Sequence, residues 1–521
     1  MKRIFSHCTI GALFLLGWSA RTSAQEAPKE APAEAKSSEA KAASAAPEPK
    51  EESSVTDHTI RIGGQSIPYR ATALTTLLKN DKDEPTALIY STAYVRSDVK
   101  DPSQRPIAFL YNGGPGSASI WLHMGAFGPR RVVTDNAAAT PPAPYKLVDN
   151  ESSLLDKADL VFIDPVGTGF SHAVGKAQDK DFWGVDEDVK SLAQFISIYV
   201  SRNNRWNSPK FLIGESYGTF RSVALGEYLE SNDNMPVNGI VLISSVLNMG
   251  TLSFSPGNDQ PYIFYLPTYA AVAWYYKLLK DRPDDLSAFL EEARQFASTE
   301  YAAALMKGSK LTAAEKADMA KKVARFTGLS EDYLIKADLR VTLSQFRAEI
   351  QRSRGVIVGR YDARYRGPMY DLLAERAEFD PSFSAVAGAF TAAFNSYVRS
   401  ELKFGGDKSY KVLPDGPGEA WDWKHVSGGG FPGAPSVDID LIHAMTEDSH
   451  LQVQVENGYF DMATPFFATE YTMDHLLLPD SGRSRIHLQY YNAGHMMYLH
   501  EEDLAKLKTN VGGFIDSAWK P

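Results

Sequence analysis

Four short apolar runs are the feature that most limits how this 521-residue chain can fold. They read IAFLY, ADLVFI, KFLI and GIVLI, at positions 107–111, 158–163, 210–213 and 239–243. Runs that are apolar at successive positions are typical of parallel strands covered on both faces. Between the second and third runs, VDEDVKSLAQFISIYVSR has the apolar spacing of a helix, as a β-α-β unit requires. The chain is therefore predicted to be an α/β protein with a mostly parallel central sheet.

The rest of the folded part divides into segments with different hydrophobic patterns. Alternating apolar and polar residues around a Gly-Gly turn predict an antiparallel hairpin from His58 onward. Helical spacing dominates residues 251–434, and strand patterns return afterwards at LQVQV and IHLQY. We therefore expect a core made of residues 58–250 and 435–521, interrupted by a helical cap.

The N-terminal residues predict export. A basic start, the apolar run IGALFLLGW and the small residues before Gln25 are typical of a signal peptide over residues 1–24. The apolar run is too short to span a bilayer, so no stable membrane insertion is expected after cleavage. Residues 25–57 consist almost entirely of Ala, Glu, Lys, Pro and Ser, which predicts a disordered tether.

Composition argues against several classes of protein. A net charge of −10 and a pI near 5.7 do not suit a nucleic-acid-binding surface. The one cysteine, Cys8, lies in the expected signal peptide, so the mature chain would have no thiolate nucleophile, disulfide or cysteine-bound metal. For an exported chain of this size, the lack of disulfides favours a bacterial periplasm over a eukaryotic secretory route.

The motif GESYG follows the run KFLI directly and places Ser216 between two glycines. Such a sequence predicts a nucleophile elbow, a strained strand-to-helix turn that holds the serine Oγ above the end of a sheet. The flanking glycines let the backbone turn sharply without a Cβ clash. The alternative is an ordinary loop, because so short a motif also arises by chance.

Each of the last two predicted strands is followed by a residue that a nucleophilic serine needs. Asp461 comes just after LQVQV, and His495 comes just after IHLQY. The chain order Ser, Asp, His is that of the α/β-hydrolases, in which the imidazole takes the serine proton and the carboxylate fixes its tautomer. Asp461 could instead cap the following helix, and His495 could be a core histidine.

A glycine-rich loop, NGGPG at residues 112–116, directly follows the run IAFLY. Backbone N–H groups of such a loop can bind a developing oxyanion, with a second donor from Tyr217, the residue after the serine. A plain turn is the alternative. A phosphate-binding loop is less consistent with the sequence, since no Gly-Lys-Ser/Thr follows.

Five sequence blocks together resemble the serine carboxypeptidase family, particularly its secreted bacterial members. They span about Ala108 to Tyr498 and read NGGPGSAS, FIDPVGTGFSH, GESYG, NGYFD and AGHM. The resemblance implies an α/β-hydrolase fold with a helical insertion. It also implies that the chain removes C-terminal residues from peptides through an acyl-enzyme on Ser216, without a metal or cofactor.

The same resemblance implies roles for eight residues. Those expected to act on the scissile bond are the catalytic Ser216, Asp461 and His495 and the oxyanion-hole residues Gly114 and Tyr217. Those expected to bind the substrate are Asn112 and Glu215, at its terminal carboxylate, and Met496, in the pocket for the leaving residue.

The chain departs from the family in the glycine-rich block. Ser117 replaces a cysteine, and Ala126 replaces a glutamate that would share a proton with Glu215. Without that partner, Glu215 is expected to ionise more readily unless burial opposes it. Arg130 and Arg131 would then bind the substrate carboxylate, or else are solvated surface residues.

Two other functions stay open. One is a different α/β-hydrolase activity, an esterase or a proline-specific aminopeptidase, because Gly-Gly-Pro-Gly loops occur there too. The other is a catalytically silent envelope-binding protein. Side-chain preference, pH optimum, exopeptidase strictness and oligomeric state have no readable signal in the sequence.

Overall fold

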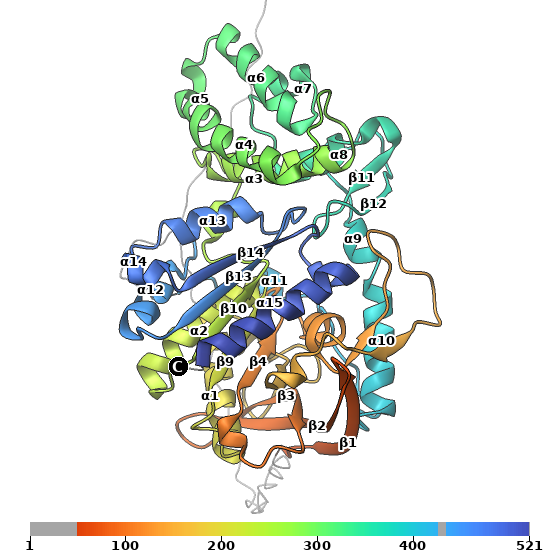
Figure 1. Cartoon of the computed structure of the whole chain (residues 1–521), viewed down its shortest axis with the longest axis vertical. Helices are drawn as coiled ribbons and strands as arrows, with labels where there is room; N and C mark the ends of the chain where they lie inside the picture. Colours follow the sequence, from red (N-terminus) through yellow and green to blue (C-terminus); the bar gives the residue numbers. More distant parts are fainter. Residues whose placement is uncertain (1–48, 426–433, 520–521) are drawn as a thin grey trace, which may run out of the picture. The chain divides into compact units, whose positions relative to one another are not determined.

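The computed structural model describes residues 49–425 and 434–519, which build a central ten-stranded sheet (Figure 1). The strands are β1 Ser53–Ile62, β2 Gln65–Lys79, β3 Pro85–Arg96, β4 Ile107–Tyr111, β7 Asp159–Ile163, β8 His172–Ala173, β9 Lys210–Glu215, β10 Gly239–Ile243, β13 Gln452–Gly458 and β14 Ile486–Tyr491. Their order is β1-β2-β3-β7-β4-β9-β10-β13-β14, and β8 pairs with β3. The predicted signal peptide lies outside the described residues.

The sheet is parallel from β7 to β14 and antiparallel from β1 to β7. All four apolar runs are strands, and every residue of β4, β7, β9 and β10 is buried. Alternate side chains of one strand enter different cores: in β4, Ala108 and Leu110 join one apolar cluster, whereas Ile107 and Phe109 join another. Burial on both faces explains why these strands have no polar face.

Helices cover both faces of the sheet (Figure 1). The helices α1 (Val185–Arg202), α2 (Tyr217–Asp233) and α12 (Asp438–Glu447) contribute to the core on one face. On the other face lie α15 (Glu501–Trp519) and the π-helical turn Leu122–Phe127. Sheet and helices together form the α/β architecture predicted from the sequence.

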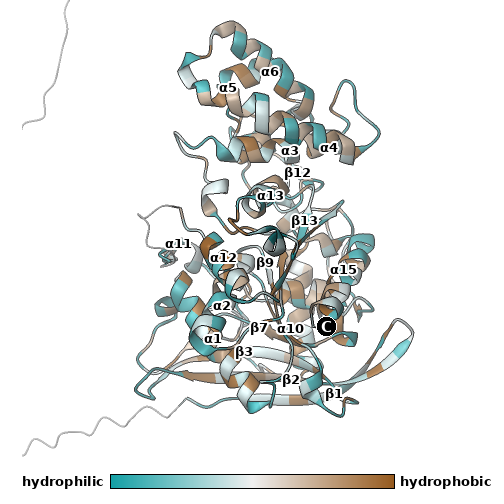
Figure 2. Ribbon diagram, turned by 60° about the vertical axis from the view of Figure 1, so that its left-hand side comes forward, coloured by the Kyte–Doolittle hydropathy of each residue, from teal (hydrophilic) through white to brown (hydrophobic). Residues whose placement is uncertain are grey.

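The inserted segment has its own apolar core. Its helices are α3 Gln260–Tyr275, α4 Leu286–Phe296, α5 Ala302–Lys307, α6 Ala313–Thr327, α7 Glu331–Lys336 and α8 Leu343–Glu349. In Figure 2 the helices α3 to α6 carry both hydrophilic and hydrophobic residues, as amphipathic helices do. Within residues 49–425 and 434–519, no helix combines the length and apolar character needed to cross a bilayer.

The segment after α8 differs from a simple cap. The strands β11 (Val356–Val358) and β12 (Arg366–Pro368) pair with each other, and α9 (Pro381–Ser384) leads into α10 (Ala387–Ser400). Side chains of α10, including Phe390 and Phe394, join the core beside the sheet and not that of α3 to α8. The expected cap over residues 251–434 therefore includes a helix that packs on the sheet core, and its boundaries stay predictions.

The expected end of the tether at residue 57 needs correction, because β1 begins at Ser53. Residues Ser53 to Asp57 pair with β2, and the backbone N–H of Leu77 donates to the Glu51 carboxylate. This edge strand is held by main-chain hydrogen bonds, so it forms without the apolar residues that would have revealed it. Residues 25–48 lie outside the described part of the chain.

We expect a deletion of residues 25–57 to lower the melting temperature, because it removes the paired first half of β1. A deletion of residues 25–47 serves as the matched control and should leave the melting temperature unchanged, since that composition cannot form a core. Differential scanning calorimetry of the two shortened proteins makes the comparison. Equal melting temperatures would contradict a stabilising role for the start of β1.

Candidate active site

Ser216 lies at the turn between β9 and α2, with backbone angles φ 61° and ψ −130°. A positive φ is unusual for a residue with a side chain and stores strain. The turn is tight enough that a Cβ on Gly214 would lie 2.1 Å from the carbonyl oxygen of Gly218. Ser216 is half-buried whereas its neighbours are buried, so the turn presents this side chain at the end of the sheet.

Asp461 and His495 follow β13 and β14, which are parallel neighbours in the sheet. Nδ1 of His495 lies 2.7 Å from Oδ2 of Asp461, and both side chains are almost fully buried. Oδ1 of Asp461 accepts the N–H groups of Ala463 and Thr464, and Oδ2 accepts the Thr464 hydroxyl at 2.7 Å. Asp461 therefore holds the turn that follows it and is bonded to the imidazole, but it does not cap the next helix, Phe466–Asp474, whose N-cap is Pro465.

One pocket brings most of the predicted residues together. Its lining comprises Asn112, Gly113, Gly114, Ser117, Trp121, Glu215, Ser216, Tyr361, Phe383, Leu413, His495 and Met496. Two predicted residues are not part of the lining: Tyr217 is buried at the start of α2, and Asp461 is bonded to His495. The carboxyl ends of parallel strands meet at this edge, which is where open α/β sheets bind ligands.

The glycine-rich loop approaches the start of α2 very closely. A Cβ on Gly113 would lie 2.4 Å from the backbone nitrogen of Tyr217, and Gly114 has a φ of +109°. Only glycine fits such an approach. The first N–H groups of a helix have no partner within that helix and favour negative charge, which applies to Tyr217 at the start of α2. The roles of Gly114 and Tyr217 as oxyanion donors stay predictions.

Glu215 lies beside Ser216 and is 3% exposed. Burial raises the pKa of its carboxyl to about 7, and the nearby His495 opposes this rise. The exception stated for Glu215 therefore applies: burial opposes ionisation, because desolvation disfavours the charged form. A neutral carboxyl here can donate a hydrogen bond at neutral pH.

The structure contradicts substrate binding by the two arginines. Arg130 pairs with Asp149 and Glu401, and Arg131 pairs with Glu501. Neither guanidinium lines the pocket. Each has a carboxylate partner outside the site, so neither is placed to bind a ligand in the pocket.

Arg221 is a residue of this site that the sequence reasoning missed. It lies on α2 with no exposure, donating at 2.6 Å to Oδ2 of Asp188 and at 2.6 Å to the carbonyl of Asn112. Its guanidinium also lies 5.2 Å from the centre of the Tyr217 ring. Arg221 thus joins the glycine-rich loop to the helix that begins at the elbow. The sequence feature that could have revealed it is an arginine among small and apolar residues in the first half of α2.

Replacing Arg221 by methionine is expected to destabilise the protein by about 3–5 kcal/mol, because the buried Asp188 would lose its counter-charge. Arg202→Met, which removes an exposed pair with Glu51, is the control and should cost about 0–1 kcal/mol. Urea unfolding curves of the two variants give both values. Similar costs for both would mean that Asp188 is protonated and neutral in the native protein.

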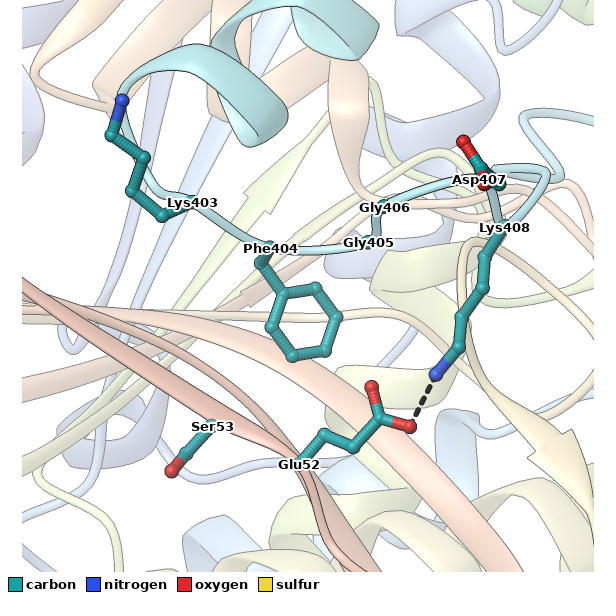
Figure 3. A pocket seen from close by; sticks show the side chains of 8 residues that line it. All are labelled: Glu52, Ser53, Lys403, Phe404, Gly405, Gly406, Asp407 and Lys408. Carbon is teal, nitrogen blue, oxygen red and sulfur yellow. Dashed lines mark hydrogen bonds and ion pairs between the residues drawn. The ribbon is translucent and has the colours of Figure 1, made fainter.

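Another hollow, of about 740 Å³, lies between the start of β1 and the loop 403–408 (Figure 3). Glu52 and Lys408 form an ion pair across it. Its lining includes none of the predicted site residues. Among the described residues, no three His, Cys, Asp or Glu side chains are grouped to hold a metal ion.

Sequence comparison relates the chain to known peptidases. A family model described as serine carboxypeptidase matches residues 71–250. Serine carboxypeptidase-like 45 of Arabidopsis thaliana is 27% identical over 179 residues, which are 33% of this chain and 36% of that protein. Pheromone-processing carboxypeptidase KEX1 of Saccharomyces cerevisiae is 28% identical over 196 residues, 36% of this chain and 25% of that protein. The matches thus span about a third or less of these relatives.

The fold is similar to a solved structure over most of its length. The crystal structure of KEX1(Δ)p, a prohormone-processing carboxypeptidase from Saccharomyces cerevisiae, covers 86% of this chain and 90% of its own, with a TM-score of 0.52 and 18% identity. This likeness confirms the predicted fold class. The matched residues 71–250 contain the glycine-rich loop and the elbow but not Asp461 or His495, whose roles rest on the geometry above.

Proposed function

We propose that this chain, a member of the serine carboxypeptidase family, releases C-terminal residues from peptides through an acyl-enzyme on Ser216. One observation carries the proposal: a single pocket is lined by Ser216 and His495 and also by Asn112 and Glu215. The first pair supplies a nucleophile and a base. The second pair supplies neutral donors for a terminal carboxylate, so the bond cleaved would be the last one in the chain.

In the proposed reaction, His495 accepts the proton of Ser216 Oγ while the oxygen attacks the carbonyl carbon of the last peptide bond. The N–H groups of Gly114 and Tyr217 stabilise the resulting oxyanion. His495 then protonates the leaving nitrogen, and the C-terminal residue departs to leave an ester on Ser216. A water molecule then gives a proton to His495 and attacks the ester carbon, and His495 returns that proton to Ser216 Oγ as the bond to the serine breaks.

The terminal carboxylate would accept hydrogen bonds from Asn112 and from the neutral carboxyl of Glu215. Oδ1 of Asn112 accepts the N–H of Leu122 at 3.0 Å, which fixes the amide with its NH₂ group available. The aromatic and aliphatic lining, Trp121, Phe383 and Leu413, favours apolar residues at the end of the substrate.

We expect KM for free-acid peptides to rise with pH above about 7, because Glu215 then ionises, stops donating and repels the substrate carboxylate. If the enzyme with ionised Glu215 does not bind the free-acid peptide at all, KM rises about tenfold per pH unit. The pKa of Glu215 is also influenced by His495, Tyr498, Asp461 and Asn112. The quantity to measure is kcat/KM for a free acid divided by kcat/KM for the same peptide amide. Titration of the catalytic base affects both substrates equally and drops out of this ratio.

Glu215→Gln is the matched control for this pH dependence. It keeps a neutral donor at all pH values, so its ratio for acid and amide should stay level as pH rises. A wild-type ratio that does not change with pH would contradict the role of Glu215 at the carboxylate.

A peptide of defined sequence tests the proposed activity, offered as free acid, as C-terminal amide and as N-acetylated acid. Mass spectrometry should show loss of the C-terminal residue, from the N-acetylated peptide too, and a fluorophosphonate should label Ser216. Loss from the N-terminus would indicate an aminopeptidase, and cleavage of esters alone an esterase. Failure of the native protein to be labelled would favour the silent binding protein.

Export to a bacterial periplasm is part of the proposal and rests on the composition of residues 1–24, which lie outside the described residues. Fractionation of a bacterial host that expresses the full chain tests it. The processed protein should appear in the periplasmic fraction, with a new N-terminus at Gln25.

A further inference from the structure

Three buried polar atoms converge behind the pocket. They are Nδ2 of Asn112, Oε2 of Glu215 and the hydroxyl oxygen of Tyr498, and within the described part of the chain none makes a well-formed hydrogen bond. The three residues are 2%, 3% and 3% exposed. Buried polar atoms without a partner cost free energy, and a ligand in the pocket could satisfy those of Asn112 and Glu215, which line it.

The three groups act on one another. The Tyr498 hydroxyl and the Asn112 side chain both stabilise the ionised form of Glu215, and Glu215 in turn raises the pKa of Tyr498. Asn112 and Glu215 line the pocket, whereas Tyr498 does not. Tyr498 therefore lies behind the two residues that would meet a substrate.

The position of Tyr498 is fixed by the segment that contains Ala126. A Cβ on Gly125 would lie 2.6 Å from Cε2 and 2.7 Å from Cδ2 of the Tyr498 ring. The ring thus packs directly on the backbone of the π-helical turn Leu122–Phe127, where only glycine leaves room. Ala126 itself is fully buried and small.

We propose that Tyr498 is a positioning residue whose hydroxyl holds the side chains of Glu215 and Asn112 toward the terminal carboxylate of a bound peptide. This inference rests on the proposed function and specifies how its substrate would be recognised. Burial holds the pKa of Tyr498 well above its usual value, so the phenol donates without adding negative charge near the substrate. A second carboxyl could do this only while protonated.

Tyr498→Phe tests the proposal, with kcat and KM measured from acidic to alkaline pH on a free-acid peptide and its amide. We expect KM for the free acid to increase about 3- to 10-fold, with kcat and the KM of the amide unchanged. The pH at which KM begins to rise should also move upward, because ionised Glu215 has lost a donor. Tyr397→Phe removes another buried hydroxyl of the same core, one bonded to Tyr94, and should change neither quantity.

An equal rise in KM for acid and amide, or an unmoved pH profile, would overturn the positioning role and leave Tyr498 as a packing residue. If Tyr498→Phe does not fold, Gly125→Ala displaces the ring while keeping the hydroxyl, and the same selective rise in KM is expected. An unchanged KM for the free acid in that variant would equally overturn the proposal. Failure of the proposed function is distinct, because the wild type itself would then release no C-terminal residue.

Discussion

Alanine in place of Ser216 or of His495 is expected to lower kcat for peptide hydrolysis by about a millionfold, and replacing both should cost little more. The two side chains act in one step, since the imidazole must take the proton that the oxygen loses. Removal of either therefore removes the whole nucleophilic pathway. The activity that remains would come from binding and from the oxyanion donors alone.

Single-turnover kinetics on a free-acid peptide, with purified single and double variants, measure this non-additivity. Ser222→Ala is the matched control, because Ser222 is buried on the same helix and bonds to Gly218 and Tyr111 without lining the pocket. It should keep nearly full activity. Most of the activity surviving in Ser216→Ala would rule out an acyl-enzyme on this residue.

The sheet and the elbow were predictable because their causes are local. The runs in β4, β7, β9 and β10 are apolar at every position, since their side chains enter two cores. Ser216 lies at a turn that requires Gly214, and glycine is visible in a sequence. Asp461 and His495 were found because each follows a strand, and parallel strands end at one edge.

Features held by the backbone were harder to predict. The first residues of β1 pair with β2 through main-chain hydrogen bonds, and Ser53, Ser54 and Asp57 give no apolar signal.

The helix α10 has an ordinary amphipathic pattern, which predicts a helix but not the core it joins. Only the tertiary structure places its side chains beside the sheet.

Contacts between residues far apart in the chain, and the burial they create, were not predictable at all. Nothing near Tyr498 in the sequence indicates that its ring packs on Gly125. Arg221 could be noticed, but its bond to the carbonyl of Asn112 could not. The burial that decides the pKa of Glu215 was hidden for the same reason, because desolvation depends on every element packed around the carboxyl.

Asp461→Asn is expected to fold and to lower kcat by about four orders of magnitude, because of how the carboxylate is bonded. Oδ1 accepts two backbone N–H groups, from Ala463 and Thr464, so the amide oxygen of asparagine must take that place. Its NH₂ group then occupies the position of Oδ2, 2.7 Å from Nδ1 of His495. An amide donates there, so Nδ1 has to accept and the imidazole proton moves to Nε2. In that tautomer His495 cannot take the proton of Ser216.

The loss should lie in kcat and not in KM, since neither Asn112 nor Glu215 is altered. Thr464→Val serves as the control: it removes the hydroxyl that bonds Oδ2 and lies 3.2 Å from Nδ1 of His495, but it keeps the carboxylate that selects the tautomer. Its kcat should fall only several-fold, as expected for the loss of a single neutral donor. Equal losses in Asp461→Asn and Thr464→Val would mean that Asp461 acts by holding its turn in place. A loss confined to Asp461→Asn, with an unchanged melting temperature, would assign it the orientation of His495.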